Sequence, residues 1–102
     1  MDKLTLCANI LLRLEEGGRP SHELTPYFAE PTSCVIQCLK KLKNLGFIDS
    51  IRGPDGGYWI KTALPLFGEL TEALGFSSYG YSHFLKTASL YSLFTGTTKG
   101  EE

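Results

Sequence analysis

A glutamine, two lysines and an arginine in the middle of the chain are the side chains best suited to contact a partner molecule. Gln37, Lys40 and Lys41 lie close together, and Arg52 directly precedes the glycine-rich stretch Gly53–Gly57. A glutamine amide can form two hydrogen bonds with the edge of an adenine, whereas cationic side chains bind phosphates and enter narrow minor grooves. These groups favour contact with a nucleic acid duplex rather than bond-breaking chemistry.

The distribution of charge supports the same interpretation, although the net charge of the 102-residue chain is only −1. Residues 31–62 carry five basic and two acidic side chains, a balance of +3, and the rest of the chain carries five basic and nine acidic side chains, a balance of −4. A basic segment within an acidic frame favours nucleic acid binding. Because three excess charges hold DNA weakly, the composition also favours a dimer as the binding form.

Helices must position these side chains. Apolar residues at helical spacing predict helices over residues 4–16, 21–29 and 32–45, with Ser21 capping the second. A Gly-Gly pair ends the first helix and Gly46 ends the third. The third helix is expected to bury one apolar stripe and to turn its polar residues outward. That stripe consists of Val35, Cys38, Leu39 and Leu42.

After the third helix, the period of the sequence changes to that of a β-hairpin. Residues 47–52 and 58–60 are expected to be its strands, joined by a turn at 53–57. Further helices are predicted over 66–74 and 83–94, separated by a linker at 75–82. The polar tail, residues 95–102, is expected to be disordered.

Three helices followed by a glycine-tipped hairpin predict a mainly α winged helix-turn-helix domain over residues 1–75. The third helix would enter the major groove and the hairpin, as the wing, the minor groove. Ile36, an apolar residue expected on the outward face, would match a thymine methyl group. The candidate DNA-binding residues are Ser21, Thr32, Ser33, Cys34, Ile36, Gln37, Lys40, Lys41, Arg52, Gly53, Gly56 and Tyr58.

Three segments resemble one known family. Arg52–Tyr58, with the sequence RGPDGGY, resembles the wing of the Rrf-two family of bacterial transcription regulators, the IscR/NsrR/CymR type. Ser33–Leu42 is similar to its recognition helix, and Leu66–Leu70 to the segment that opens the helix after its wing. The resemblance implies a homodimeric DNA-binding regulator, usually a repressor, with a long C-terminal helix that crosses to the partner.

The same resemblance bears on cofactors. Family members that hold an iron–sulfur cluster carry three cysteines between the helix after the wing and the dimer helix. Residues 75–90 contain no cysteine, so no cluster and no other cofactor is expected. Cys34 and Cys38 alone form an incomplete zinc site, and no metal is expected. Cys38 is interpreted as a core residue, whereas thiol sensing by Cys34 stays open as an alternative.

Several further expectations concern partners and location. The aromatic residues of 76–94 favour a dimerisation helix, with a small-ligand pocket as the alternative. A winged-helix protein–protein interaction module is the alternative function. The chain has no G-x-S-x-G, Walker or H-E-x-x-H motif and is not expected to be an enzyme. It has no long apolar run, no signal-peptide pattern and three cysteines, so a cytoplasmic location is expected.

Overall fold

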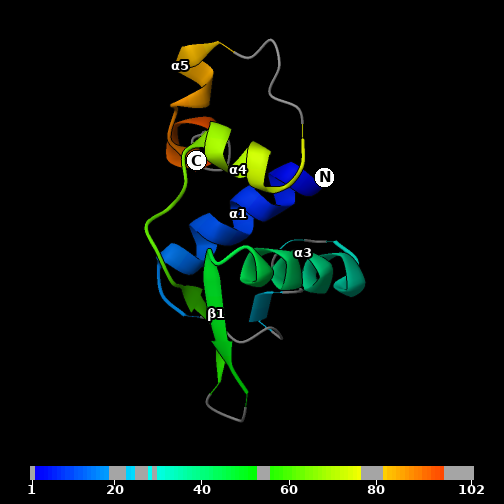
Figure 1. Ribbon diagram of the computed structural model, residues 1–102. Helices are drawn as coiled ribbons and strands as arrows, with labels where there is room; N and C mark the ends of the chain where they lie inside the picture. The colour runs from blue at the N-terminus through cyan, green and yellow to red at the C-terminus, as the bar shows by residue number, and fades with distance from the viewer. Residues whose placement is uncertain are drawn as a thin grey trace.

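The computed structural model describes residues 2–18, 23–24, 28, 30–52, 56–76 and 82–95. Most of the helix predicted over 21–29, the tip of the hairpin at 53–55 and the tail beyond residue 95 lie outside these ranges. Figure 1 shows the elements in chain order. They are α1 (Lys3–Glu15), α3 (Thr32–Asn44), β1 (Ile48–Ile51), β2 (Gly57–Ile60), α4 (Phe67–Ala73), α5 (His83–Lys86) and the π-helix η1 (Tyr91–Thr95).

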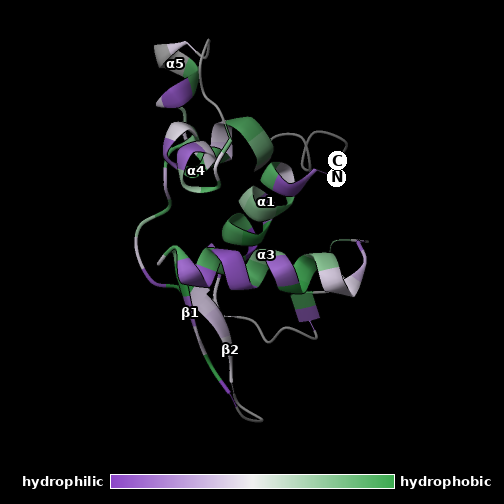
Figure 2. Ribbon diagram, turned by 45° about the vertical axis from the view of Figure 1, so that its right-hand side comes forward, coloured by the Kyte–Doolittle hydropathy of each residue, from purple (hydrophilic) through white to green (hydrophobic). Residues whose placement is uncertain are grey.

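Helix α1 is the central element of the core. The Asp2 carboxylate accepts a hydrogen bond of 2.7 Å from the backbone N–H of Thr5, and this bond caps the helix and lowers the pKa of Asp2. α1 lies between α3 with the hairpin on one side and η1 on the other (Figure 1). Its apolar surface is therefore broad, as Figure 2 shows by colour. The buried residues are Leu6, Cys7, Ala8, Ile10, Leu11, Leu12 and Leu14.

Helix α3 buries the apolar stripe that the spacing predicted, and its ends agree closely with the predicted ones. Val35, Cys38, Leu39 and Leu42 are all buried and belong to the same cluster as the residues of α1. Gly46 ends the helix with φ +88°, a conformation that favours glycine. There the N–H of Phe47 donates to the carbonyl of Leu42, the arrangement of a Schellman motif. This turn leads the chain from α3 directly into β1.

The two strands form the predicted antiparallel hairpin. Ile48 pairs with Ile60 and Ile51 with Gly57. Since side chains alternate along a strand, the hairpin has an inner face, which includes Ile48 and Ser50, and an outer face, which includes Asp49 and Ile51. Ile48 is buried in the core, whereas Ile51 is 62% exposed. The inner face thus attaches the hairpin to the helices.

The single C-terminal helix predicted over 83–94 is wrong. α5 covers only His83–Lys86, and the chain then forms a bridge between Ser89 and Leu66 before entering η1. The N–H of Phe67 donates to the carbonyl of Ala88, and the Ser89 hydroxyl accepts from the N–H of Ser92. These bonds satisfy backbone groups outside an α-helix, which is how serine competes with helix formation.

The segment after this break folds back on its own domain. Leu90 is 1% exposed, and the Phe94 ring lies 6.2 Å from that of Phe67. η1 also contacts α1. The aromatic segment 76–94 is therefore not one dimerisation helix, and part of its apolar surface is used within the protomer. The division of the chain after residue 75 and the dimer itself stay predictions.

The packing of this segment on the domain predicts that substitutions at two neighbouring residues change the free energy of unfolding by very different amounts. Leu90→Ala should lower the free energy of unfolding by about 2–4 kcal/mol, because it removes a buried side chain. Tyr91→Ala, whose side chain is 45% exposed, should cost less than about 1 kcal/mol. Urea unfolding followed by circular dichroism measures both. Equal losses for the two variants would contradict the packing of this segment.

Candidate nucleic-acid interface

The outward surface of α3 is a polar ridge. Ser33, Gln37, Lys40 and Asn44 are exposed and recur at helical spacing opposite the buried stripe. Thr32 and Cys34 are also exposed in the first turn, which begins at Pro31. The ridge presents hydroxyl, amide and ammonium groups without an interrupting apolar side chain. These are the groups that bind phosphates and base edges.

Two of the predicted contact residues lie at the sides of this ridge. Ile36 is half-buried and packs against the core, which gives its apolar character an explanation within the fold. Lys41 is half-buried as well, and its charge acts on the Cys7 thiol of α1. Both positions border the buried stripe, and their roles in DNA contact stay predictions.

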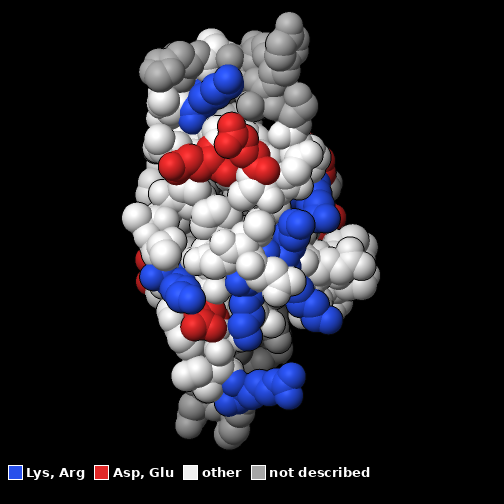
Figure 3. Space-filling model, in the orientation of Figure 1, with Lys and Arg blue, Asp and Glu red and all other residues white. Residues whose placement is uncertain are grey.

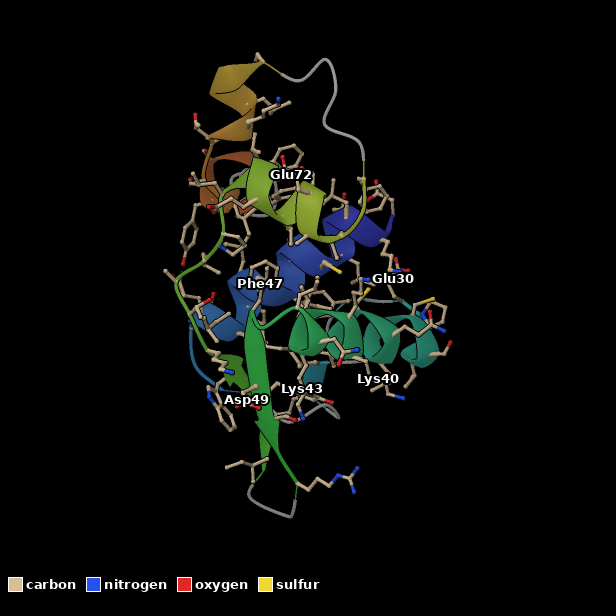
Figure 4. All side chains as sticks on the ribbon, in the orientation of Figure 1. Glu30, Lys40, Lys43, Phe47, Asp49 and Glu72 are labelled. Carbon is tan, nitrogen blue, oxygen red and sulfur yellow. The ribbon has the colours of Figure 1, made fainter. Side chains whose placement is uncertain are left out.

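The hairpin is joined to α3 by a side-chain bond. The Lys43 ammonium group donates a hydrogen bond of 2.8 Å to the Ser50 hydroxyl oxygen. Ser50 therefore faces α3, and Arg52, the residue that follows β1, is exposed. Figure 4 shows Lys40 and Lys43 on the edge of α3 that borders the hairpin. Basic side chains over α3 and over the hairpin thus lie on one face of the molecule (Figure 3).

Charge follows this geometry. In Figure 3, most of the lysines and arginines in view lie over α3 and the hairpin, whereas a group of acidic side chains lies over α4. That acidic group includes Glu69 and Glu72, which are exposed. The basic segment predicted from the sequence is therefore exposed over α3 and the hairpin, where acidic side chains are also in view (Figure 3).

The remaining predicted contact residues have different positions. Tyr58 pairs with Ser50 and is half-buried against the core. A β-carbon added to Gly56 would collide with the backbone carbonyl of Ile51, so this position at the base of the turn requires glycine. Ser21 and Gly53 lie outside the described residues. The roles of all these residues in binding stay predictions.

The cysteines separate into a buried pair and an exposed residue. Cys7 and Cys38 are buried and hydrogen bonded to each other, and this bond together with burial raises the pKa of Cys7. Cys34 is exposed near the start of α3. Within the described ranges, no three histidine, cysteine or acidic side chains form a group that could hold a metal ion.

Two residues of this face were not predicted from the sequence as candidate contacts. Lys43 and Ser50 lie between the ridge and Arg52, but neither was among the candidate contacts. A signal for Ser50 was present, since the alternation of a strand places it on the same side as Arg52. The bond between the two residues depends on the angle between helix and hairpin, which no local pattern specifies.

Comparison with solved structures shows the fold to be that of a winged helix. The chain superimposes on CymR (YrzC), the global cysteine regulator of B. subtilis, with a TM-score of 0.66 and 17% identity over 91% of this chain and 90% of that one. A Listeria innocua protein classed as a transcriptional regulator matches with a TM-score of 0.55 and 19% identity, over 97% of this chain and 71% of that one. No family model and no curated protein matches the sequence.

One structural neighbour is thus described as a global cysteine regulator and the other as a transcriptional regulator. At this level of identity the likeness confirms the predicted fold class, a mainly helical domain with a two-stranded hairpin. In the portion of the chain that the structure describes, no helix has the length and apolar character needed to cross a membrane.

The burial of the cysteines predicts their reactivity. In the native protein, only Cys34 should react rapidly with a small thiol reagent, because Cys7 and Cys38 are inaccessible. Two further thiols should appear on addition of denaturant. Counting modified thiols by mass spectrometry checks this expectation, with Cys34→Ser as the control. A rapidly reacting thiol in the native Cys34→Ser variant would contradict the positions of the other two.

Proposed function

We propose that this protein is a sequence-specific double-stranded DNA-binding regulator of transcription, and that it is a member of the Rrf-two family. The observation that carries the proposal is the common face of the α3 ridge and Arg52 on a winged-helix scaffold. The wing sequence Arg52–Tyr58 supports it, as does the description of the two structural neighbours as a global cysteine regulator and a transcriptional regulator.

Each part of the face has a role in the proposed complex. α3 lies in the major groove, where Gln37 reads a base edge and Lys40 binds a phosphate. Thr32, Ser33 and Cys34 begin the helix and lie close to the backbone of the duplex. Arg52 enters the adjacent minor groove, and Gly56 and Tyr58 shape the base of the turn that presents it.

The proposed binding form is a homodimer that acts in the cytoplasm, most simply as a repressor. The excess of three positive charges over residues 31–62 is small for one protomer, and two copies double it. A symmetric dimer reads two half-sites about 34–36 Å apart, one turn of the duplex. Because η1 packs on its own α1, the dimer contact must use a surface other than one continuous C-terminal helix.

A second function, a winged-helix module that binds another protein, is favoured by one observation. Ile51 is 62% exposed on the outer face of the hairpin, where it does not serve the core. An exposed large aliphatic side chain beside a half-buried Trp59 is a feature of protein contacts as well. This alternative prevails if the protein binds no duplex even at low salt.

Mutations on the proposed face provide the test. Arg52→Ala and Lys40→Ala should each weaken binding about tenfold in a mobility-shift assay, because each removes a charge from the contact with phosphates or the minor groove. Lys86→Ala, which removes a lysine of α5 outside the basic segment 31–62, is the matched control and should bind as the wild type does. Unchanged binding by both Arg52→Ala and Lys40→Ala would refute the assignment of this face.

Selection from a random pool tests specificity separately. Wild-type protein should enrich a pseudo-palindromic site with half-sites one turn apart, since a two-fold dimer imposes its symmetry on the DNA. Recovery of unrelated sequences would show that binding is electrostatic only.

A further inference from the structure

The bond between Lys43 and Ser50 connects two elements that the proposed function places in different grooves. Lys43 is exposed in the last turn of α3, and Ser50 is half-buried in β1. A hydrogen bond of 2.8 Å joins the two side chains and links the helix to the hairpin. Phe47 adds a backbone link, since its N–H donates to the carbonyl of Leu42 at the end of the same helix.

The chemistry of the bond leaves the ammonium group available. A serine hydroxyl is a neutral acceptor, so it occupies one of the three N–H groups of Lys43 and does not cancel its charge. Among the described residues, no carboxylate forms an ion pair with Lys43. An ion pair is observed between Arg13 and Glu16. Asp49 lies next to Ser50, but strand alternation places its side chain on the outer face, and its carboxylate accepts from the Ser50 N–H.

The position of this ammonium group corresponds to one particular part of a duplex. Adjacent major and minor grooves are separated by a sugar–phosphate backbone. A protein with a helix in one groove and a wing in the next must therefore have that backbone passing between the two elements. Lys43 lies at the junction of the two elements. On the helix it follows Lys40 by three residues, and its partner Ser50 precedes Arg52 by two residues.

From this juxtaposition we infer that Lys43 binds the phosphate between the two groove contacts, and that Ser50 is a positioning residue that holds its ammonium group there. The inference rests on the proposed function and extends it to Lys43 and Ser50, which are not among the candidate contacts predicted from the sequence. Ser50 acts by restricting a flexible side chain before the duplex arrives, so that less conformational freedom is lost on binding.

The experiment measures the affinity for a fluorescein-labelled, mixed-sequence DNA duplex by anisotropy over a series of salt concentrations. Lys43→Gln should weaken binding about tenfold at low salt and reduce the slope of log affinity against log salt by about one per protomer, since one phosphate contact is lost. Ser50→Ala should weaken binding about threefold and leave the slope unchanged, since the charge is retained. Lys86→Gln, which removes a lysine of α5 outside the basic segment 31–62, should alter neither quantity.

The double variant separates positioning from an independent contact. In the Lys43→Gln background, Ser50→Ala should have no further effect, because the group that it holds is gone. A full threefold loss in that background, or an unchanged salt slope for Lys43→Gln, would overturn the inference. Thermal unfolding of each variant confirms that it is folded, and a merely structural role of Lys43 would change stability without changing the salt slope.

The result also separates this inference from the proposed function. If wild-type protein binds and Arg52→Ala weakens binding, but Lys43→Gln behaves as wild type, the inference alone fails. If wild-type protein binds no duplex at low salt, the proposed function fails and the role of Lys43 fails with it.

Discussion

The packing of α3 on α1 is the interaction on which the rest of the structure depends. Burying a large aliphatic side chain such as Leu39 or Leu42 contributes roughly 1.5–3 kcal/mol, and both are fully buried. This contact fixes which side of α3 is inside and therefore which side is presented to a partner. Every polar group of the ridge, from Ser33 to Asn44, owes its exposure to the stripe on the opposite side.

The turn between α3 and the hairpin determines how the wing is oriented relative to α3. Gly46 adopts a left-handed conformation that few other residues tolerate, and its turn directs Phe47 and Ile48 back toward the core. Because Ile48 is anchored there, Ser50 lies on the side of α3, and the exposed Arg52 follows two residues later. The winged-helix face is thus a consequence of one helix contact and one turn, and the Lys43–Ser50 bond adds a side-chain link between the same elements.

The elements that could be predicted from sequence are those with a strong period or a decisive glycine. The stripe of α3, the end at Gly46 and the hairpin around residues 53–57 satisfy these conditions. The prediction of one helix over 83–94 is wrong because the conformation of this segment depends on contacts with a segment distant in the sequence. Ser89 forms a bridge with Leu66, and no pattern local to either residue reveals that pairing.

In the candidate site, too, helical spacing predicts the exposed residues, whereas contacts between elements distant in the sequence could not be predicted. Helical spacing identified Gln37 and Lys40 on the ridge, since exposure there is simply the opposite of burial. It did not show that Ile36 and Lys41, which border the buried stripe, are half-buried, because the width of a buried face depends on what packs against it. Lys43 and Ser50 come together only through the angle between helix and hairpin.

The most direct test of the account is a map of the backbone amides that respond to DNA. A mixed-sequence duplex would be titrated at low salt into isotopically labelled protein, and the amide shifts followed by NMR. A DNA-binding face built from α3 and the wing predicts the largest changes over residues 32–44 and 50–58, with α4 and η1 nearly unaffected. Changes concentrated on α4 and η1, or no saturable change at all, would contradict a DNA-binding face built from α3 and the wing.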